Sequence, residues 1–205
     1  MAREGPAIVV AMALPAESDG RFEKQGIEVL YTGVGKVNAA VALMRRLARH
    51  RREGCEPPFV VNFGTAGGVS VPPRTLVACH RFVDRDMDVS PLGVAPGVTP
   101  FDELPPVLEF PPCFTGLPEA LCGTGDSFAT RAQRVACDVV DMEAYALAKA
   151  CRIDGAGFAC AKYVSDGADD RAAEHWRENV AGAADLFVKL YEELVSRLAS
   201  GANLA

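Results

Sequence analysis

Phe-Val-Val-Asn-Phe-Gly-Thr-Ala-Gly-Gly, at residues 59–68, is an apolar run with β-branched members that ends in glycine. A run without polar alternation is typical of a strand that is covered on both of its faces. The same pattern occurs in Ala-Ile-Val-Val-Ala-Met-Ala-Leu, at residues 7–14. We expect central strands at residues 7–14 and 59–64, the second of them followed directly by the Thr-Ala-Gly-Gly segment.

Strands and helices alternate along the rest of the chain. Further strands are predicted at residues 27–33, 75–83, 121–126 and 156–164. Helices are predicted at residues 37–47, 138–151 and 176–198. This order predicts one α/β domain, residues 1–205, with a central mixed, mostly parallel sheet flanked by helices.

Residues 90–118 interrupt this alternation, because they are rich in proline. Proline removes a backbone donor and fixes φ, so regular structure there should be short and a long irregular loop is expected. Loops of this length are often functional or contact a partner, and a plain surface excursion is the alternative.

Composition bounds the class of protein. The chain has 205 residues, 49% of them hydrophobic, and 21 basic against 27 acidic residues give a net charge of -6. This charge argues against a general attraction to nucleic acid or to an anionic membrane surface. No apolar run approaches the roughly 20 residues that span a bilayer, and no signal peptide is recognisable, so a cytoplasmic protein is expected.

The cysteines and histidines do not indicate a metal or disulfide framework. The seven cysteines form no Cys-x-x-Cys pair and are odd in number, which disfavours a zinc ribbon. Several lie in apolar runs, where a free thiol commonly serves as a small buried hydrophobe. The three histidines are scattered, so we expect neither a metal nor a cofactor.

Several predicted strands end in glycine or a small polar residue, namely Gly33, Gly64, Gly123, Gly125 and Ser165. In open α/β sheets, ligands bind beyond the carboxyl ends of the strands, where small residues let backbone amides approach the ligand. The pattern predicts one cleft at this edge of the sheet.

Gly-Val-Gly-Lys, at residues 33–36, superficially suggests a phosphate-binding loop. It lacks the GxxxxGK[ST] spacing and the hydroxyl residue that follows the lysine in such loops. Lys36 is therefore expected to be a solvated residue at the start of its helix.

Three carboxylates follow or begin predicted elements near the glycine-rich edge. Glu143 follows Met142 in a helix-forming stretch, Asp166 follows a buried strand, and Glu17 follows the first strand. Each has a structural alternative: Glu143 as a surface charge with Met142 in the core, Asp166 as a helix cap, and Glu17 as a helix-start residue. Taken singly, none of the three identifies a site.

Their order and spacing resemble a known family. The stretches that carry the resemblance are Ala-Met-Ala-Leu-Pro-Ala-Glu (11–17), Thr-Gly-Val-Gly-Lys-Val-Asn-Ala-Ala (32–40), Asn-Phe-Gly-Thr-Ala-Gly-Gly (62–68), Arg-Asp-Met-Asp-Val-Ser-Pro-Leu-Gly (85–93), Gly-Thr-Gly-Asp-Ser-Phe (123–128), Asp-Met-Glu-Ala (141–144) and Val-Ser-Asp-Gly-Ala-Asp (164–169). In this order they are similar to the nucleoside phosphorylase and nucleosidase superfamily, most of all to its 5'-methylthioadenosine/S-adenosylhomocysteine nucleosidases. The resemblance covers nearly the whole chain and implies a phosphorylase/hydrolase-like fold.

The resemblance implies a role for each carboxylate. The bond from ribose C1' to the base nitrogen breaks through an oxocarbenium-like transition state. Asp166 matches the general acid that protonates N7 of the purine, which requires a raised proton affinity. Glu143 matches the glutamate that binds the ribose hydroxyls in its ionised form, with Met142 packing on the sugar. Glu17 matches the carboxylate that orients and deprotonates the attacking water.

Further residues are placed by the same resemblance. Ser165 would support Asp166, and Phe128 would stack on the base. The sugar and water side would be lined by Thr65, Ala66 and Gly67.

Two positions depart from the superfamily pattern. Lys162 stands where the nucleosidases usually have arginine, which keeps the charge but loses the planar fork. Asp141 replaces the glutamate common before Met-Glu, and we still count it among the substrate-binding residues. The chain is also shorter than the superfamily pattern, with two peripheral elements missing.

Water and phosphate are the two candidate nucleophiles. A phosphorylase gathers arginines around a dianionic phosphate, and near the first strand the only candidate is Arg21, while Glu17 would repel phosphate. Hydrolysis of a purine nucleoside is therefore the main prediction, and a phosphate-dependent phosphorylase is the first alternative. A nucleoside-binding protein without catalysis is the second alternative, although a pure binder has no need of a general acid.

Assembly is implied by the resemblance alone. In this superfamily a neighbouring subunit commonly completes the site, so we expect a homodimer. The loop at residues 86–104, with Leu92 and Phe101, is the segment expected to reach across. The alternative is that these apolar side chains pack on their own domain.

Overall fold

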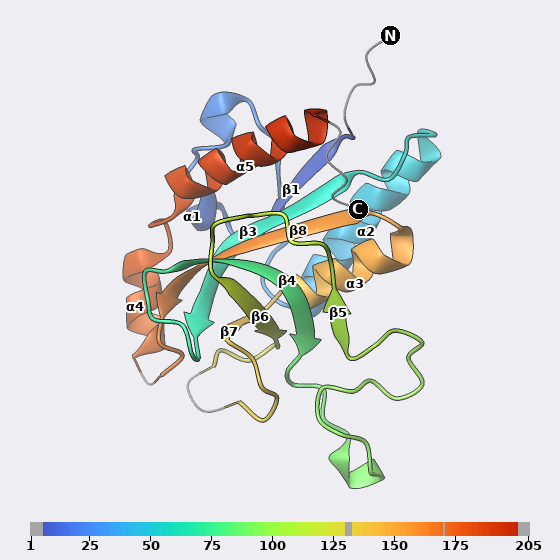
Figure 1. Cartoon of the computed structure of the whole chain (residues 1–205), viewed down its shortest axis with the longest axis vertical. Helices are drawn as coiled ribbons and strands as arrows, with labels where there is room; N and C mark the ends of the chain where they lie inside the picture. The colour runs from blue at the N-terminus through green and yellow to red at the C-terminus, as the bar shows by residue number, and fades with distance from the viewer. Residues whose placement is uncertain (1–5, 130–132, 170, 201–205) are drawn as a thin grey trace.

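The computed structural model describes residues 6–129, 133–169 and 171–200, and its centre is one eight-stranded sheet (Figure 1). The strands are β1 Ile8–Met12, β2 Val29–Tyr31, β3 Phe59–Gly68, β4 Leu76–Asp84, β5 Val107–Glu109, β6 Glu119–Thr124, β7 Val139–Asp141 and β8 Gly157–Asp166. Their order is β2-β1-β3-β7-β6-β4-β5, and β8 pairs with both β3 and β4. Strands β3, β8, β4, β6 and β7 thus pair in a closed ring.

Five of the eight strand pairings are parallel, and the exceptions are β3 with β7, β4 with β5, and β4 with β8. The prediction of a mixed, mostly parallel sheet is therefore confirmed. Pairing between β3 and β8 contains one irregularity: Ala66 lies opposite Val164, but Gly67 lies opposite Asp166, so that Ser165 is an extra residue in β8. Such a bulge turns the side chains that follow it.

Helices cover both faces of the sheet. They are α1 Pro15–Ser18, α2 Lys36–Arg52, α3 Ala144–Asp154, α4 Ala172–Asn179 and α5 Ala184–Ala199, with short 3-10 turns η1 at Glu23–Gln25 and η2 at Ser90–Leu92. Helices α2 and α3 lie side by side on one face, and α5 lies on the other (Figure 1). Among the described residues, no helix combines the length and the apolar character that crossing a bilayer requires.

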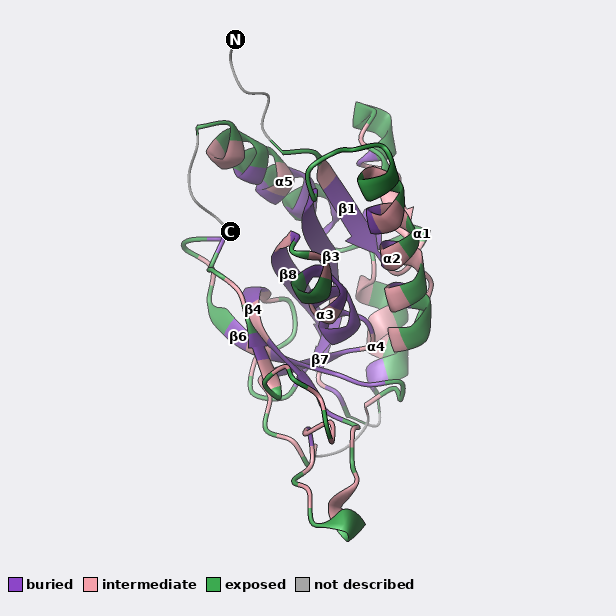
Figure 2. Cartoon of the chain, turned by 90° about the vertical axis from the view of Figure 1, so that its right-hand side faces the viewer, coloured by how far each residue is buried: buried purple, intermediate pink, exposed green. Residues whose placement is uncertain are grey.

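The two faces of β3 pack into two separate cores, which explains its unbroken apolar sequence. Val60 belongs to the core under α2 and α3, whereas Val61 and Phe63 belong to the core under α5. The ring of Phe63 stacks on that of Phe187 with centroids 5.1 Å apart. Figure 2 shows the resulting buried sheet between partly exposed helices.

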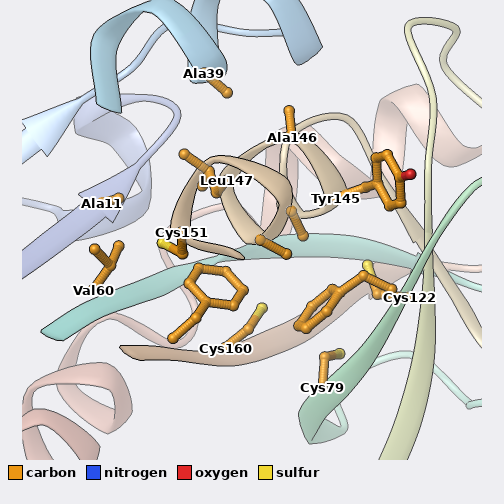
Figure 3. Packing of buried hydrophobic residues seen from close by; sticks show 14 of the residues in the cluster. Ala11, Ala39, Val60, Cys79, Cys122, Tyr145, Ala146, Leu147, Cys151 and Cys160 are labelled. Atoms are coloured by element: carbon orange, nitrogen blue, oxygen red, sulfur yellow. The ribbon is translucent and has the colours of Figure 1, made fainter. Parts of the chain in front are cut away.

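Five of the seven cysteines are buried apolar residues of these cores. Cys79, Cys122, Cys151 and Cys160 pack among the side chains of the α3 face (Figure 3), and Cys113 lies in the core under α5. All seven cysteines are free thiols, and burial raises the pKa of Cys151 above its ordinary value. The structural interpretation of the cysteines in apolar runs is confirmed.

Two predicted helices were wrong in their bounds. The helix predicted from residue 138 begins only at Ala144, because Val139–Asp141 forms strand β7 between β3 and β6. The helix predicted at 176–198 is interrupted between α4 and α5, where the N–H of Gly182 donates to the carbonyl of Asn179 at 2.8 Å. A Cβ at Gly182 would lie 3.0 Å from that carbonyl oxygen, so a side chain there would be crowded by the turn.

The proline-rich segment is mostly irregular, as predicted, but it also contains strand β5, which pairs with β4. Its 3-10 turn η2 projects from the body of the protein and is exposed (Figure 2).

Candidate active site

One pocket of about 230 Å³ opens at the ends of β1, β3, β7 and β8. Its wall includes all the predicted site residues but one: Glu17, Thr65, Ala66, Gly67, Phe128, Asp141, Met142, Glu143 and Asp166. Ser165 lies behind the wall, where its hydroxyl donates to Asp166 at 2.8 Å. The structure therefore brings these side chains together at one pocket, while their part in a site and their chemical roles stay predictions.

Glu17 is held by four hydrogen bonds. The N–H groups of Ala13 and Leu14 donate to Oε2 at 3.0 and 3.1 Å, and the N–H and hydroxyl of Thr65 donate to Oε1 at 2.8 and 3.1 Å. Glu17 thus belongs to the first turn of α1 and also reaches across to β3. These donors fix the orientation of a carboxylate that is only 4% exposed.

Glu143 lies directly before α3 and faces the N-terminus of α2 across the pocket. The N–H of Gly35 donates to its Oε1 at 2.9 Å. Burial, and next the negative charge of Asp141, raise the pKa of Glu143 to about 7, although Lys162 and the Gly35 N–H act in the opposite direction. The surface-charge alternative is wrong, because this residue is buried. That Glu143 binds ribose in its ionised form stays a prediction, and its raised pKa makes this ionisation depend on pH near neutrality.

Asp166 ends β8 and is 3% exposed. Its Oδ1 accepts a hydrogen bond from the N–H of Ala168 at 2.9 Å, and Ser165 donates to Oδ2. Burial raises the pKa of Asp166, while these two hydrogen bonds lower it. The helix-cap alternative is wrong, since α4 begins at Ala172 after Arg171. A raised pKa is what a carboxyl group needs to donate a proton near neutral pH.

Asp141 and Lys162 form a buried ion pair with 2.9 Å between Oδ2 and Nζ. Asp141 also accepts hydrogen bonds from the Thr124 hydroxyl at 2.5 Å and from the Ala144 N–H at 2.8 Å. Burial opposes its ionisation, but the attraction of Lys162 and these donors outweigh burial and lower the pKa of Asp141. Lys162 is only 1% exposed. Burial is the largest single influence and lowers the Lys162 pKa, but Asp141, Cys160, Cys122 and Glu143 together outweigh burial and raise this pKa well above its ordinary value.

Two glycines of β3 leave room for these groups. A Cβ at Gly64 would lie 2.9 Å from Glu17 Oε1 and 3.3 Å from Lys162 Nζ. A Cβ at Gly67 would lie 2.9 Å from Asp166 Oδ1. The strand therefore brings its backbone against the carboxylates at positions where any side chain would displace them.

Sequence reasoning missed Arg85, which also lines the pocket. Its guanidinium donates to the carbonyl and hydroxyl oxygens of Ser127, to the carbonyl of Gly125 and to Gln133 Oε1. Arg21, named from the sequence as a candidate phosphate ligand, instead contacts Asp19 and Asp185 near the surface. The pocket thus has an arginine, but its N–H groups hold the segment that leads to Phe128.

Lys36 begins α2, as predicted, but the expectation that its side chain is simply solvated was wrong. Its Nζ contacts Asp84 at 2.8 Å and Asp86 at 2.6 Å, and its backbone N–H donates to Asp126 at 2.7 Å. These contacts join the N-terminus of α2 to the ends of β4 and β6 beside the pocket.

Trp176 was given no role from the sequence beyond an apolar stripe, yet it lines the pocket from α4. Its indole N–H donates to the Thr65 hydroxyl oxygen at 3.0 Å. The sequence offered one signal that Trp176 could be a site residue: it is the single tryptophan of the chain.

Comparison with known proteins assigns the family. Residues 19–121 and 124–200 match the model of the phosphorylase superfamily. The chain belongs to the phosphorylase superfamily. A relative within it is the 5'-methylthioadenosine/S-adenosylhomocysteine nucleosidase of Geobacillus thermodenitrificans, 31% identical over 208 residues that cover 91% of this chain and 86% of the relative.

Solved structures of the superfamily share the fold. The 5'-methylthioadenosine/S-adenosylhomocysteine nucleosidase from Helicobacter pylori with butyl-thio-DADMe-Immucillin-A has a TM-score of 0.79 at 19% identity, covering 94% of this chain and 99% of that chain. The native futalosine hydrolase of Helicobacter pylori strain 26695 also gives 0.79 at 19% identity, with 94% and 98% covered. The superfamily fold predicted from the motifs is therefore confirmed.

Proposed function

We propose that this chain hydrolyses the N-glycosidic bond of a purine nucleoside of the 5'-methylthioadenosine/S-adenosylhomocysteine type, releasing the free base and a ribose derivative. The observation that carries the proposal is that Glu17 from α1, Glu143 from the position before α3 and Asp166 from the end of β8 reach one pocket. The chain is a nucleosidase of the phosphorylase superfamily, and its named relatives are nucleosidases of this type.

Each carboxylate has a separate task in the reaction. The C1'–N bond breaks, its electron pair passes to the base, and Asp166 gives its proton to N7, so that the base leaves neutral. Ionised Glu143 accepts hydrogen bonds from the ribose hydroxyls and stabilises the positive charge that develops on the sugar. Water adds to C1' and gives a proton to Glu17, which leaves the ribose derivative.

The remaining site residues position these groups. Phe128 stacks on the base and Met142 packs on the sugar. Ser165 supports Asp166 through its hydrogen bond, and Ala66 lines the sugar side with Thr65. We further propose that residues 1–205 act as one catalytic domain that needs no cofactor.

Water is favoured over phosphate because of the charges that line the pocket. Glu17 would lie against a phosphate bound on its side of the ribose, and like charges repel at such distances. Arg85 already donates its terminal N–H groups to protein oxygens. Among the described residues that line the pocket, Arg85 is the one arginine, so a phosphate dianion there would meet the charge of Glu17 without a guanidinium group whose terminal N–H groups are free.

Product analysis tests this choice. Incubation with 5'-methylthioadenosine should release adenine and a reducing sugar at the same rate with and without phosphate. Strict phosphate dependence with a ribose 1-phosphate product would mean a phosphorylase, and no turnover of any nucleoside despite binding would mean a binding protein. Running the same assay with S-adenosylhomocysteine, adenosine, inosine and futalosine would identify the preferred nucleoside.

The pH dependence should show the ionisation of Glu143. Because its pKa is raised to about 7, the ribose-binding form accumulates as pH rises through this value, so kcat/KM should rise with an apparent pKa near 7. The raised pKa also makes the free energy of unfolding depend on pH. The contribution of Glu143 to this free energy is fully present below about pH 4.5 and is lost as the pH rises through about 7. The Glu143→Gln variant should not show this rise of kcat/KM with pH. If the rise persists in the variant, it does not report the ionisation of Glu143.

A homodimer is the proposed assembly. Leu92 is 79% exposed and Phe101 is fully exposed, with φ at 60°, on the loop at residues 86–104. Burying an aromatic side chain that is held outward in this way would be favourable, and a second subunit could supply the cover. Exposed apolar side chains also lie just before α2 and in its first two turns: Val34, Val37 and Val41. Sedimentation should give the mass of two chains, and Phe101→Asp should shift the protein to monomer.

The cytoplasm is the proposed compartment. The free thiols of the chain suit a reducing environment, where cysteines stay unpaired. Detection of the protein in the soluble cytoplasmic fraction of its host would support this placement, and recovery from a secreted fraction would oppose it.

A further inference from the structure

Trp176 has a polar contact that the proposed mechanism does not use. It lines the pocket from α4, and its indole N–H donates to the Thr65 hydroxyl oxygen at 3.0 Å. That hydroxyl in turn donates to Glu17 Oε1 at 3.1 Å. Three side chains from α4, β3 and α1 therefore form one hydrogen-bonded chain that ends on the carboxylate beside the water site.

The chain of hydrogen bonds has a direction, because a threonine hydroxyl carries a single hydrogen. While the indole N–H points at the Thr65 oxygen, the hydroxyl hydrogen is kept out of that direction and turns toward Glu17. Glu17 Oε1 then receives both the hydroxyl and the N–H of Thr65. Removing the indole N–H would free the hydroxyl to rotate, so the position of the Glu17 carboxylate would be less well defined.

Helix α4 holds the indole in place by a second contact on the same face. The Asn179 side-chain N–H donates to the carbonyl of Ser165 at 3.2 Å, three residues along the helix from Trp176. Residues three apart lie on one side of a helix. Helix α4 therefore contacts Thr65 of β3 through Trp176 and Ser165 of β8 through Asn179. Figure 1 shows α4 beside the ends of these two strands.

We propose that Trp176 is a positioning residue for the water-activating carboxylate: its indole N–H sets the Thr65 hydroxyl, and this hydroxyl sets Glu17. The inference rests on the proposed role of Glu17 in hydrolysis. Docking of α4 then adds to the orientation of Glu17, whose carboxylate is also held by the N–H groups of Ala13, Leu14 and Thr65.

Trp176→Phe tests the inference, because phenylalanine keeps an aromatic ring and removes the N–H. We expect kcat to fall about 3- to 10-fold, the worth of one neutral hydrogen bond, with KM changed less than about twofold. In a Thr65→Val background the same substitution should cause no further loss, since the partner hydroxyl is already absent. Glu178→Ala, on an exposed position of the same helix, is the matched control and should keep the wild-type kcat.

Three kinetic outcomes would overturn the inference: an unchanged kcat in Trp176→Phe, an equal loss in both backgrounds, or a change confined to KM. A readout independent of turnover comes from tryptophan emission, since the chain has one tryptophan. Thr65→Val should shift this emission by removing the acceptor of the indole N–H, and an unshifted spectrum would show that the hydrogen bond is absent. If wild type is inert on every nucleoside tested, the proposed function fails, whereas the emission test still reports on the contact.

Discussion

Asp166→Asn should reduce kcat by about 10²- to 10⁴-fold, the usual contribution of a positioned general acid. Asparagine keeps the size of the side chain and can still meet the Ala168 N–H, but it has no acidic proton to give to the departing base. The asparagine side chain would occupy the same buried position that raises the pKa of Asp166, so the variant differs chiefly in lacking the acidic proton. Steady-state kinetics with 5'-methylthioadenosine would measure the loss.

Binding should survive this substitution. Thermal shift with a cationic nucleoside analogue that imitates the oxocarbenium ion should give similar stabilisation of wild type and variant. Asp185→Asn is the matched control, since it makes the same chemical change on an exposed side chain of α5. A variant at position 166 with nearly wild-type kcat would remove Asp166 from the role of general acid.

Lys162→Met should be the most destabilising single change in the site. It would leave the buried Asp141 carboxylate without its cation, and breaking such a pair by removing one partner costs about 3–5 kcal/mol. For a chain of this size, the melting temperature should fall by on the order of 10 °C. Calorimetry or thermal unfolding by circular dichroism would measure the shift.

Companion variants separate charge from packing. Lys162→Arg keeps the charge and should lose less stability. Lys162→Met combined with Asp141→Asn should recover part of the loss, because neither position of the pair then carries a buried charge. The loss in Lys162→Met should also shrink at acid pH, where the uncompensated Asp141 becomes protonated. A melting temperature unchanged by Lys162→Met would show that the ion pair contributes nothing to stability.

The sequence predicted those features that follow from local pattern. Asp166 directly follows a long buried strand and Gly64 lies within another, so the carboxyl edge of the sheet could be located from apolar runs and their ends. Strand β7 was missed because three residues, Val139–Asp141, adjoin a helix-forming stretch and become a strand only through pairing with β3 and β6.

The contacts of the site depended on residues far apart in the chain. Trp176 lies 111 positions from Thr65, and Arg85 lies 42 positions from Ser127, so neither contact leaves a local signature. The raised pKa of Glu143 likewise depends on burial and on the Asp141 charge held beside it by the fold. A sequence motif can identify a residue such as Glu143, but it does not show which distant groups surround that residue in the fold.

Ser165, the extra residue in β8, helps to give Asp141 and Asp166 different electrostatic neighbours. Lys162 and Asp166 are four positions apart, and in a regular strand both side chains would project to the same side. With Ser165 inserted, the Asp166 carboxyl group lies against Gly67, while the ammonium group of Lys162 lies against Gly64 and pairs with Asp141. Asp141 consequently has a lowered pKa and Asp166 a raised pKa. One inserted residue thus lets the same strand carry both the proposed proton donor and the cation of a buried ion pair, with the Lys162 ammonium group directed to Asp141.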